Sequence, residues 1–484
     1  MTTHLSQTKS YLYEQVAAGI AELIRLGTFR PGERIPSVRQ LNRQNKISIS
    51  TALQAYMLLE DQGLIEARPQ SGYYVRQRMT EGQQELEISA PAPDPTRVGS
   101  RELVMMIIRD TANLDLIQLG TAFPNSDLVA NDKLSRIMVS IARQAKREHG
   151  LYDIPPGNEA LRIQIAQRSV LSGCLLTPAD IVTTSGIMEA YSLSLRAVCC
   201  PGNTVAIESP AYFANLQALE ALDLRALEIP AHPRTGISLE ALRFALDHNQ
   251  VHACLVNPNF SNPLGSCMPD DKKQELVEIL AAREIPLIEG DDSGELFFSG
   301  QRPSVCKAYD RKGLVLHCSS FSNVLSPGYR VGWLVPGRFK AAVEWQKVTT
   351  NMATATLPQL VIAQFLDSGG FDRHLRSIRR VYATYMAQMA EAILKYFPEG
   401  TRVTHPNGGY VLWVQLPSNV DSLQLYKQAL NAGITLAPGY IFSATDQYRN
   451  FIRLNAASWN FQAAQAVQRL GELVYDQQKL TDNS

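Results

Sequence analysis

The sequence predicts two domains of different class, a small helical module with a hairpin and a large α/β domain. Three observations support this division. Three short amphipathic helical patterns precede an alternating hairpin pattern within the first 78 residues. A polar, proline-rich stretch follows, and from about residue 103 short apolar runs alternate with amphipathic helices. A chain of 484 residues suits two or three domains, the larger with a sizeable core.

The N-terminal pattern has the order of a winged helix-turn-helix. Residues 9–26 place apolar side chains on one face of a helix that ends at Gly27. Ser37 is suited to cap a short second helix, and Ser48 to cap a third helix that ends at Gly63. Beyond it, "LIEARPQSGYYV" alternates around a turn, as a β-hairpin does.

Polar residues of this module lie where such a fold meets a duplex. The N-terminal part of the third helix should face base edges in a major groove, and arginines near the second helix and the hairpin should contact phosphates. The alternative is a small protein-binding domain with a solvated basic face, since ten Lys or Arg against six Asp or Glu give this module an excess of only about +4. The candidate DNA-binding residues are Arg34, Arg39, Ser48, Ser50, Thr51, Gln54, Arg68 and Gly72.

The large domain is predicted from its apolar runs. The segments "DIVTTSG", "TVAIESP", "ACLVNPN", "IPLIEGDD" and "GLVLHCSSFS" are typical of buried strands, and the helical patterns between them imply a largely parallel sheet covered by helices. The last hundred residues, with "GGYVLWVQLP" and "FIRLNAA", are consistent with a smaller α+β lobe. The expected domains are therefore 1–78, a linker over 79–102, and 103–484.

Composition excludes several classes of protein. Forty-six basic residues balance forty-six acidic ones, so the whole chain has no electrostatic bias toward nucleic acid or a membrane. No apolar run approaches the roughly 18 residues of a membrane span, and no signal-peptide core is present. Seven scattered cysteines indicate cytoplasmic thiols, and a cytoplasmic location is expected. His248 and His252 are one helical turn apart but lack a third ligand, so no metal site is expected.

Residues 10–76 resemble the DNA-binding domains of the GntR family. The segments "RLGTFRPGERIPSVRQL" and "AYMLLEDQGLIEARPQSGYYV" carry this resemblance, which implies a double-stranded DNA operator as partner. Ile49 and Leu53 stand where some relatives have arginines on the recognition helix. The base preference of those relatives therefore does not carry over, and apolar contacts to thymine methyl groups become an option.

Roughly residues 105–480 resemble aspartate-aminotransferase-like enzymes of pyridoxal-phosphate (PLP) fold type I. A GntR domain joined to such a domain is the architecture of the MocR subfamily. "YDIPPGNEALR" is similar to the segment near the dimer-shared pocket, which implies a homodimer, and "TTSGIMEA" is a strand-to-helix turn suited to a phosphate. The resemblance assigns the following residues to a cofactor or effector pocket: Gly186, Ile187, Tyr212, Asn262, Ser320, Ser322, Arg330 and Arg453.

Each of these residues matches a family role. Tyr212 matches the aromatic residue that stacks on the cofactor ring, and Asn262 the amide that bonds its phenolic oxygen. Arg330, with the two preceding serines of the set, matches the phosphate cup, where a guanidinium binds two oxygens at once. Arg453 matches the arginine that receives the α-carboxylate of a substrate.

The residues that perform the family's chemistry are replaced. In "SSFSNVLSPGYRVGW", Asn323 stands where the family has its Schiff-base lysine, and an amide nitrogen is not a nucleophile. In "EGDDSGEL", Gly290 stands at the position of the acidic partner of the pyridine nitrogen, and Ser293 at that of a tyrosine. Asp291 is one residue off and should point to the opposite face of the strand, unless a one-residue bulge turns it back.

These features favour a transcriptional regulator whose aminotransferase-like domain senses a small-molecule effector without catalysis. The effector would be PLP-related, phosphorylated or amino-acid-like. Its binding would favour one arrangement of the N-terminal DNA-binding domains over another. No catalytic residue and no covalent cofactor are expected, although PLP or pyridoxamine 5'-phosphate could bind non-covalently. One alternative is a PLP-dependent aminotransferase with an appended DNA-binding domain, which Asn323 disfavours. Another is a regulator whose large domain is only a scaffold with a closed pocket.

Overall fold

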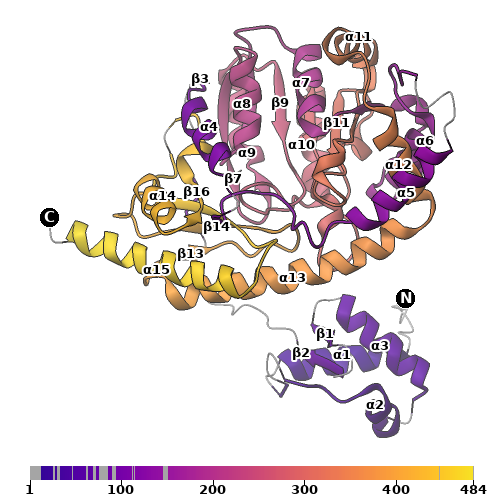
Figure 1. Ribbon diagram of the computed structural model, residues 1–484, viewed down its shortest axis with the longest axis vertical. Coiled ribbons are helices and arrows are strands. Elements are labelled where there is room, and N and C mark those ends of the chain that lie inside the picture. The colour runs from indigo at the N-terminus through magenta and orange to yellow at the C-terminus, as the bar shows by residue number, and fades with distance from the viewer. Residues whose placement is uncertain are drawn as a thin grey trace, which may run out of the picture. The chain divides into compact units, whose positions relative to one another are not determined.

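The computed structural model describes residues 12–25, 28–29, 33–45, 47–61, 64–68, 72–75, 86–89, 94–111, 113, 115–144, 151–445 and 447–482. The chain forms two compact units, one from the N-terminal 82 residues and one from most of the remainder. Figure 1 shows the helices and strands of both units. Among the described residues, no helix combines the length and the apolar character that a membrane crossing requires.

The N-terminal unit is a winged helix-turn-helix, as predicted. Its elements follow in the order α1 (Leu12–Arg25), α2 (Val38–Asn45), α3 (Ile49–Asp61), β1 (Ile65–Arg68) and β2 (Gly72–Val75). The two strands pair in antiparallel fashion. Apolar side chains from all three helices and the hairpin form one core, which includes Ala17, Ile20, Ile35, Leu41, Ala52, Tyr56, Leu59, Ile65 and Val75.

Serine side chains begin the second and third helices. The backbone N–H of Gln40 donates to Ser37 Oγ, and the Gln40 side chain accepts from the Ser37 N–H at 2.8 Å, which makes a reciprocal capping box. The Thr51 N–H donates to Ser48 Oγ at 3.0 Å. Both predicted caps are therefore present, whereas the helix ends expected at Gly27 and Gly63 lie outside the described residues.

A nine-stranded sheet forms the centre of the large unit, in the order β3-β7-β6-β9-β10-β11-β12-β5, with β8 paired to β7. Its middle strands, from β7 to β11, are parallel. The strands are β3 (Thr96–Arg97), β5 (Val182–Thr184), β6 (Thr204–Ser209), β7 (Arg225–His232), β8 (Gly236–Ile237), β9 (Ala253–Val256), β10 (Leu287–Gly290), β11 (Val315–Ser320) and β12 (Gly332–Val335).

Helices cover both faces of this sheet (Figure 1). On β6, Val205 and Ile207 belong to the core cluster on one face, and Ala206 belongs to the cluster on the other. Because both faces are buried, these strands are continuously apolar rather than alternating. The helices are α4 (Arg101–Asp110), α5 (Asn131–Arg143), α6 (Glu159–Ser169), α7 (Ile187–Val198), α8 (Phe213–Ala221), α9 (Leu239–His248), α10 (Asp270–Ala282), α11 (Lys340–Asn351) and α12 (Thr356–Asp367).

A smaller α+β lobe completes the unit, as predicted. Its sheet has the order β13-β14-β17-β16. The short strands β15 and β4 pair with each other as a separate two-stranded sheet. The long helices α13 and α15 run alongside each other (Figure 1). The bounds are β4 (Ile117–Gln118), α13 (Gly370–Tyr396), β13 (Arg402–Val403), β14 (Val411–Gln415), α14 (Ser422–Asn431), β15 (Ile434–Thr435), β16 (Ala437–Pro438), β17 (Phe451–Asn455) and α15 (Phe461–Asp482).

The segment 79–102, expected to be a linker, includes parts of the large unit. Thr96 and Arg97 form β3, which pairs with β7 at the edge of the main sheet. The Glu87 N–H donates to the side chain of Gln415 at 3.1 Å. The sequence did not indicate β3, because a two-residue edge strand in a proline-rich segment produces no periodic pattern.

Candidate functional site

A cavity of about 190 Å³ lies at the carboxyl ends of the parallel strands, the usual position for ligands in such sheets. Most of the pocket residues expected from the sequence line it: Ile187, Tyr212, Asn262, Ser320, Ser322 and Arg330. Gly186 and Arg453 join the same site through contacts with Arg330 and Asn262. The structure therefore brings the predicted pocket residues together, and the cavity is not filled by side chains.

One end of the cavity is suited to a phosphate. The Arg330 guanidinium donates to the backbone oxygen of Ser185 at 2.9 Å and to Ser322 Oγ at 3.3 Å. Gly186, at φ +89°, lets this guanidinium approach the start of α7, since a Cβ there would overlap it. Among the described residues, no side chain caps α7 at Gly186, although the Glu189 carboxylate accepts from the Ser185 N–H just before it. The backbone N–H groups of the first turn of α7 therefore remain available to an anion. Arg330 itself has a left-handed backbone, with φ +52°.

A buried arginine, Arg453, lies behind the lining residue Asn262. Arg453 is 1% exposed, and its guanidinium donates to Asn262 Oδ1 at 3.0 Å and to the backbone oxygen of Gly120. Its Nε has no hydrogen-bond partner within the described part of the chain. Burial lowers the pKa of Arg453 to about 10, opposed by the hydroxyls of Tyr212 and Tyr410. Such a cation is costly to bury unless an anion completes its hydrogen bonds.

Asn323 is hydrogen-bonded to an acidic residue in the lining of the cavity. Its Nδ2 donates to Asp292 Oδ2 at 2.8 Å, and both side chains line the cavity. Burial, followed by the charge of Asp291, raises the pKa of Asp292 to about 6. Within the described part of the large unit, no lysine lines this cavity. The side chains that line it therefore offer amides, hydroxyls, a carboxylate and an arginine, but no primary amine.

Side chains from neighbouring elements fill the space beside Gly290. A Cβ at this position would overlap both the Tyr191 hydroxyl and the side-chain amide of Asn257. These two groups are hydrogen-bonded at 2.9 Å, and Asn215 donates to Asn257 Oδ1 at 3.1 Å. A carboxylate on residue 290 therefore has no room in this fold, and a buried chain of neutral polar groups occupies its place.

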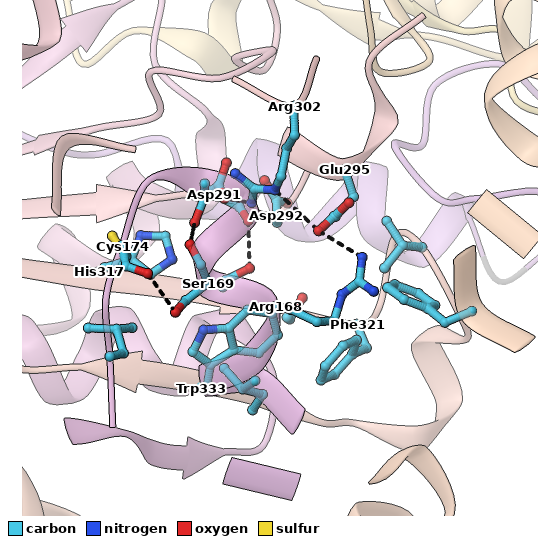
Figure 2. Close-up of a pocket in the computed structure, with 17 residues that line it drawn as sticks. Arg168, Ser169, Cys174, Asp291, Asp292, Glu295, Arg302, His317, Phe321 and Trp333 are labelled. Carbon is cyan, nitrogen blue, oxygen red and sulfur yellow. Dashed lines mark hydrogen bonds and ion pairs between the residues drawn. The ribbon is translucent and has the colours of Figure 1, made fainter. Parts of the chain in front are cut away.

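Asp291 points away from this cavity, as the strand alternation predicted, and no bulge turns it back. The ladder with β11 continues past Gly290, because the Asp291 N–H donates to the Cys318 oxygen at 2.9 Å. Its carboxylate lines a second cavity, of about 40 Å³, and pairs with Arg302. Figure 2 shows Arg302 between Asp291 and Glu295. Burial alone would raise the pKa of Asp291, but Arg302 and His317 outweigh it and lower this pKa.

The candidate DNA-binding residues occupy the expected part of the N-terminal unit. Ser48, Ser50 and Gln54 are exposed at the start of α3, and Thr51 is half-buried. Ser48 serves as the helix cap and also lies 2.7 Å from Ser50 Oγ, so its hydroxyl is already engaged. Gly72, at φ +108°, begins β2, with the Arg34 guanidinium 3.2 Å from where its Cβ would stand. Arg39 is exposed on α2, and Arg68 ends β1, its side chain lying outside the described residues.

Several residues of the site were missed from the sequence. Asp292 and Asn257 each follow a parallel strand, and this position at the carboxyl end was the available signal. The prediction concentrated instead on Asp291 and on Ser293, which does line the cavity. Tyr191 reaches the site from the middle of α7, and no local pattern marks a helix residue of this kind.

Two families match the chain in sequence. Residues 12–75 match the bacterial regulatory proteins of the gntR family, and residues 115–470 match aminotransferase class I and II. The chain is 36% identical over 469 residues to the HTH-type transcriptional regulator YdcR of Escherichia coli, covering 96% of this chain and 99% of the relative. The chain belongs to the MocR-like GntR transcriptional regulators. This regulator is also 35% identical to YjiR of Escherichia coli, over 96% of its own length and 98% of the relative.

Solved aminotransferases resemble the large unit of the regulator. The kynurenine aminotransferase of Pyrococcus horikoshii, solved with pyridoxamine 5'-phosphate (PMP) and kynurenine, is 29% identical with a TM-score of 0.72. That match covers 78% of the regulator and 94% of the enzyme. The α-aminoadipate aminotransferase of Thermus thermophilus is 27% identical with a TM-score of 0.72, covering 77% of the regulator and 95% of the enzyme. The fold of the large unit is thus that of PLP-dependent aminotransferases.

Proposed function

We propose that this regulator binds operator DNA as a homodimer and that its aminotransferase-like domain senses a small-molecule effector without catalysis. The observation that carries the proposal is the hydrogen bond between Asn323 and Asp292. It lies where the family resemblance places the lysine that holds the cofactor. Because an amide cannot condense with an aldehyde, a ligand in this cavity is held by non-covalent contacts at that position.

The described residues fit the binding half of a PLP site and not its reactive half. Arg330 and the start of α7 would hold a phosphate, and Arg453 would hold a carboxylate. PLP supplies an electron sink when an enzyme pairs its pyridine nitrogen with an acid. In the regulator, Gly290 and the side chains packed on it leave no space for that acid. We therefore assign the cavity to an effector that is bound and released unchanged.

The homodimer is supported by apolar side chains left exposed on the large unit. In the segment that resembles the dimer-shared pocket, Leu151 is 63% exposed, Tyr152 79% and Ile154 61%. Large apolar side chains that are exposed together are typical of interaction surfaces. Two DNA readers related by a two-fold axis would bind a pair of half-sites.

Aminotransferase activity is the second candidate function, and the likeness to solved aminotransferases favours it. It would require another amine to take over from Asn323. No described residue of the cavity lining provides such an amine. The acidic residue of the lining, Asp292, is hydrogen-bonded to that same asparagine. We therefore place regulation without catalysis first.

An Arg39→Ala substitution should weaken DNA binding at all sequences and lower its salt dependence. Because Arg39 is exposed on α2, where the fold faces phosphates, we expect the slope of log K against log salt to fall by about 0.9. Fluorescence anisotropy with a duplex selected in vitro by the full-length protein measures both the slope and the expected ratio of two chains per duplex. Arg469→Ala, which removes an exposed arginine paired with Glu472 on α15, is the matched control. An unchanged slope in Arg39→Ala alone would contradict the phosphate contact.

A further inference from the structure

The cavity has features that distinguish PMP from PLP, which are the amine and the aldehyde forms of the same phosphorylated cofactor. We propose that Asp292, oriented by Asn323, makes this cavity select PMP over PLP. The inference rests on the proposed function of the same pocket and names the chemistry of its ligand. The two molecules differ at one carbon, which bears an ammonium group in PMP and an aldehyde in PLP.

The first step is the position of the carboxylate. Asp292 follows β10 and lines the cavity together with Tyr212, Asn262 and Asn323. Its Oδ2 accepts from Asn323 Nδ2 at 2.8 Å. In the family, the lysine at the position of Asn323 reacts with the aldehyde of PLP. The aldehyde of PLP, or the ammonium group of PMP, would therefore lie next to Asn323 and to the Asp292 carboxylate that is hydrogen-bonded to it.

The second step is the charge of the surroundings. No cationic side chain of the described chain forms an ion pair with Asp292, whereas the neighbouring Asp291 is neutralised by Arg302. The groups whose charges interact with Asp292 are Asp291 and three tyrosine hydroxyls, all acids: Tyr191, Tyr212 and Tyr410. Arg330 lines the same cavity, and Asp292 also borders the smaller cavity that is lined by Arg168, Glu295, Arg302 and His317. A carboxylate in such surroundings gains from an incoming cation, and the raised pKa of Asp292 is consistent with that unmet demand.

The third step compares the two ligands. An ammonium group can donate to the Asp292 carboxylate and neutralise its charge, which makes a charge-assisted hydrogen bond. An aldehyde oxygen has no proton to donate and would face the carboxylate as a second acceptor. The phosphate contacts at Arg330 and the start of α7 are common to both ligands, so they raise both affinities equally. The preference therefore comes from the Asp292 end alone.

Isothermal titration calorimetry on the full-length protein tests this proposal with PMP, PLP, pyridoxine 5'-phosphate and inorganic phosphate. We expect PMP to bind at least about tenfold more tightly than PLP at pH 8, the size of one charge-assisted hydrogen bond. Pyridoxine 5'-phosphate, whose alcohol is a neutral donor, should fall between them. Asp292→Asn, which preserves the size of the side chain and an acceptor for Asn323, should bring PMP and PLP within about twofold of each other.

The pH dependence provides a second reading. PMP affinity should fall as pH decreases through about 6, because Asp292 then takes up a proton and loses its attraction for the ammonium group. The ligand phosphate also titrates near pH ~6, but it does so with Asp292→Asn as well. The difference between the two proteins therefore isolates the carboxylate.

The outcomes separate this inference from the proposed function. Equal binding of PLP and PMP to the unsubstituted protein, or a PMP preference that persists in Asp292→Asn, would overturn the inference and leave effector binding intact. If none of the four ligands gave heat, the inference would be overturned. If amino acids gave no heat either, the proposed sensing function would fail together with it, and the scaffold alternative would be supported.

Discussion

The Asn323→Lys variant should acquire PLP through the new lysine and still fail to transaminate. The lysine would supply the missing amine, but the space for an acid at residue 290 remains filled by Tyr191 and Asn257. We expect a visible absorbance band that borohydride abolishes. The turnover of amino acids should be at least about 10²-fold below that of the kynurenine aminotransferase of Pyrococcus horikoshii, a loss that one well-placed acid–base group can cause.

A double variant separates two explanations of such a failure. In Asn323→Lys the new ammonium group could be held by the Asp292 carboxylate, which would keep it protonated and unreactive. Asn323→Lys with Asp292→Asn removes that carboxylate. We expect this double variant to take up PLP more readily and to remain inactive. Appreciable turnover in either variant, measured by release of the keto acid, would refute the role assigned to Gly290.

Gly290→Ala should destabilise the large unit by about 3 kcal/mol or more, because the added methyl group has no free space in a packed core. Its Cβ would overlap the Tyr191 hydroxyl and the Asn257 amide. Urea unfolding of the full-length protein, followed by fluorescence, measures this change. Gly99→Ala is the matched control, since a Cβ there meets nothing within 4 Å and its free energy of unfolding should change by less than about 0.5 kcal/mol.

Removal of the Tyr191 hydroxyl identifies the source of that destabilisation. Tyr191→Phe deletes the oxygen that a Cβ at residue 290 would overlap, while the Asn257 amide stays in place. The double variant Gly290→Ala with Tyr191→Phe should therefore be more stable than the sum of the two single changes predicts. Strict additivity would show that the hydroxyl is not what excludes a side chain at residue 290.

Much of the fold was predictable from the sequence because its patterns are local. The strands of the main sheet are continuous apolar runs, since both faces are buried, and Ser37 and Ser48 mark helix starts through their own side chains. The strands β3, β7, β8 and β12 of this sheet were not predicted. For β3 the reason is physical, because its pairing with β7 is decided by the distant strand and not by residues 96–97 themselves.

The candidate site was predictable in its binding half and not in its electrostatics. The resemblance to fold-type I aminotransferases implied that Arg330 and Asn262 share a pocket, and both line the same cavity. The role of Asp292 depends on how β10 ends and on the direction of the Asn323 amide, which only the folded chain defines. The exclusion of an acid at Gly290 depends on side chains from α7 and from the end of β9, far away in the sequence.

Denaturing mass spectrometry of the regulator, purified from cells and treated with borohydride, tests the central claim most directly. Borohydride fixes any B6 aldehyde joined to a lysine, so a covalent cofactor survives denaturation as added mass. We predict the mass of the unmodified chain, with any small molecule released when the protein unfolds. A phosphopyridoxyl group on any lysine of the native protein, together with amino-acid turnover before reduction, would contradict a pocket that only holds its ligand.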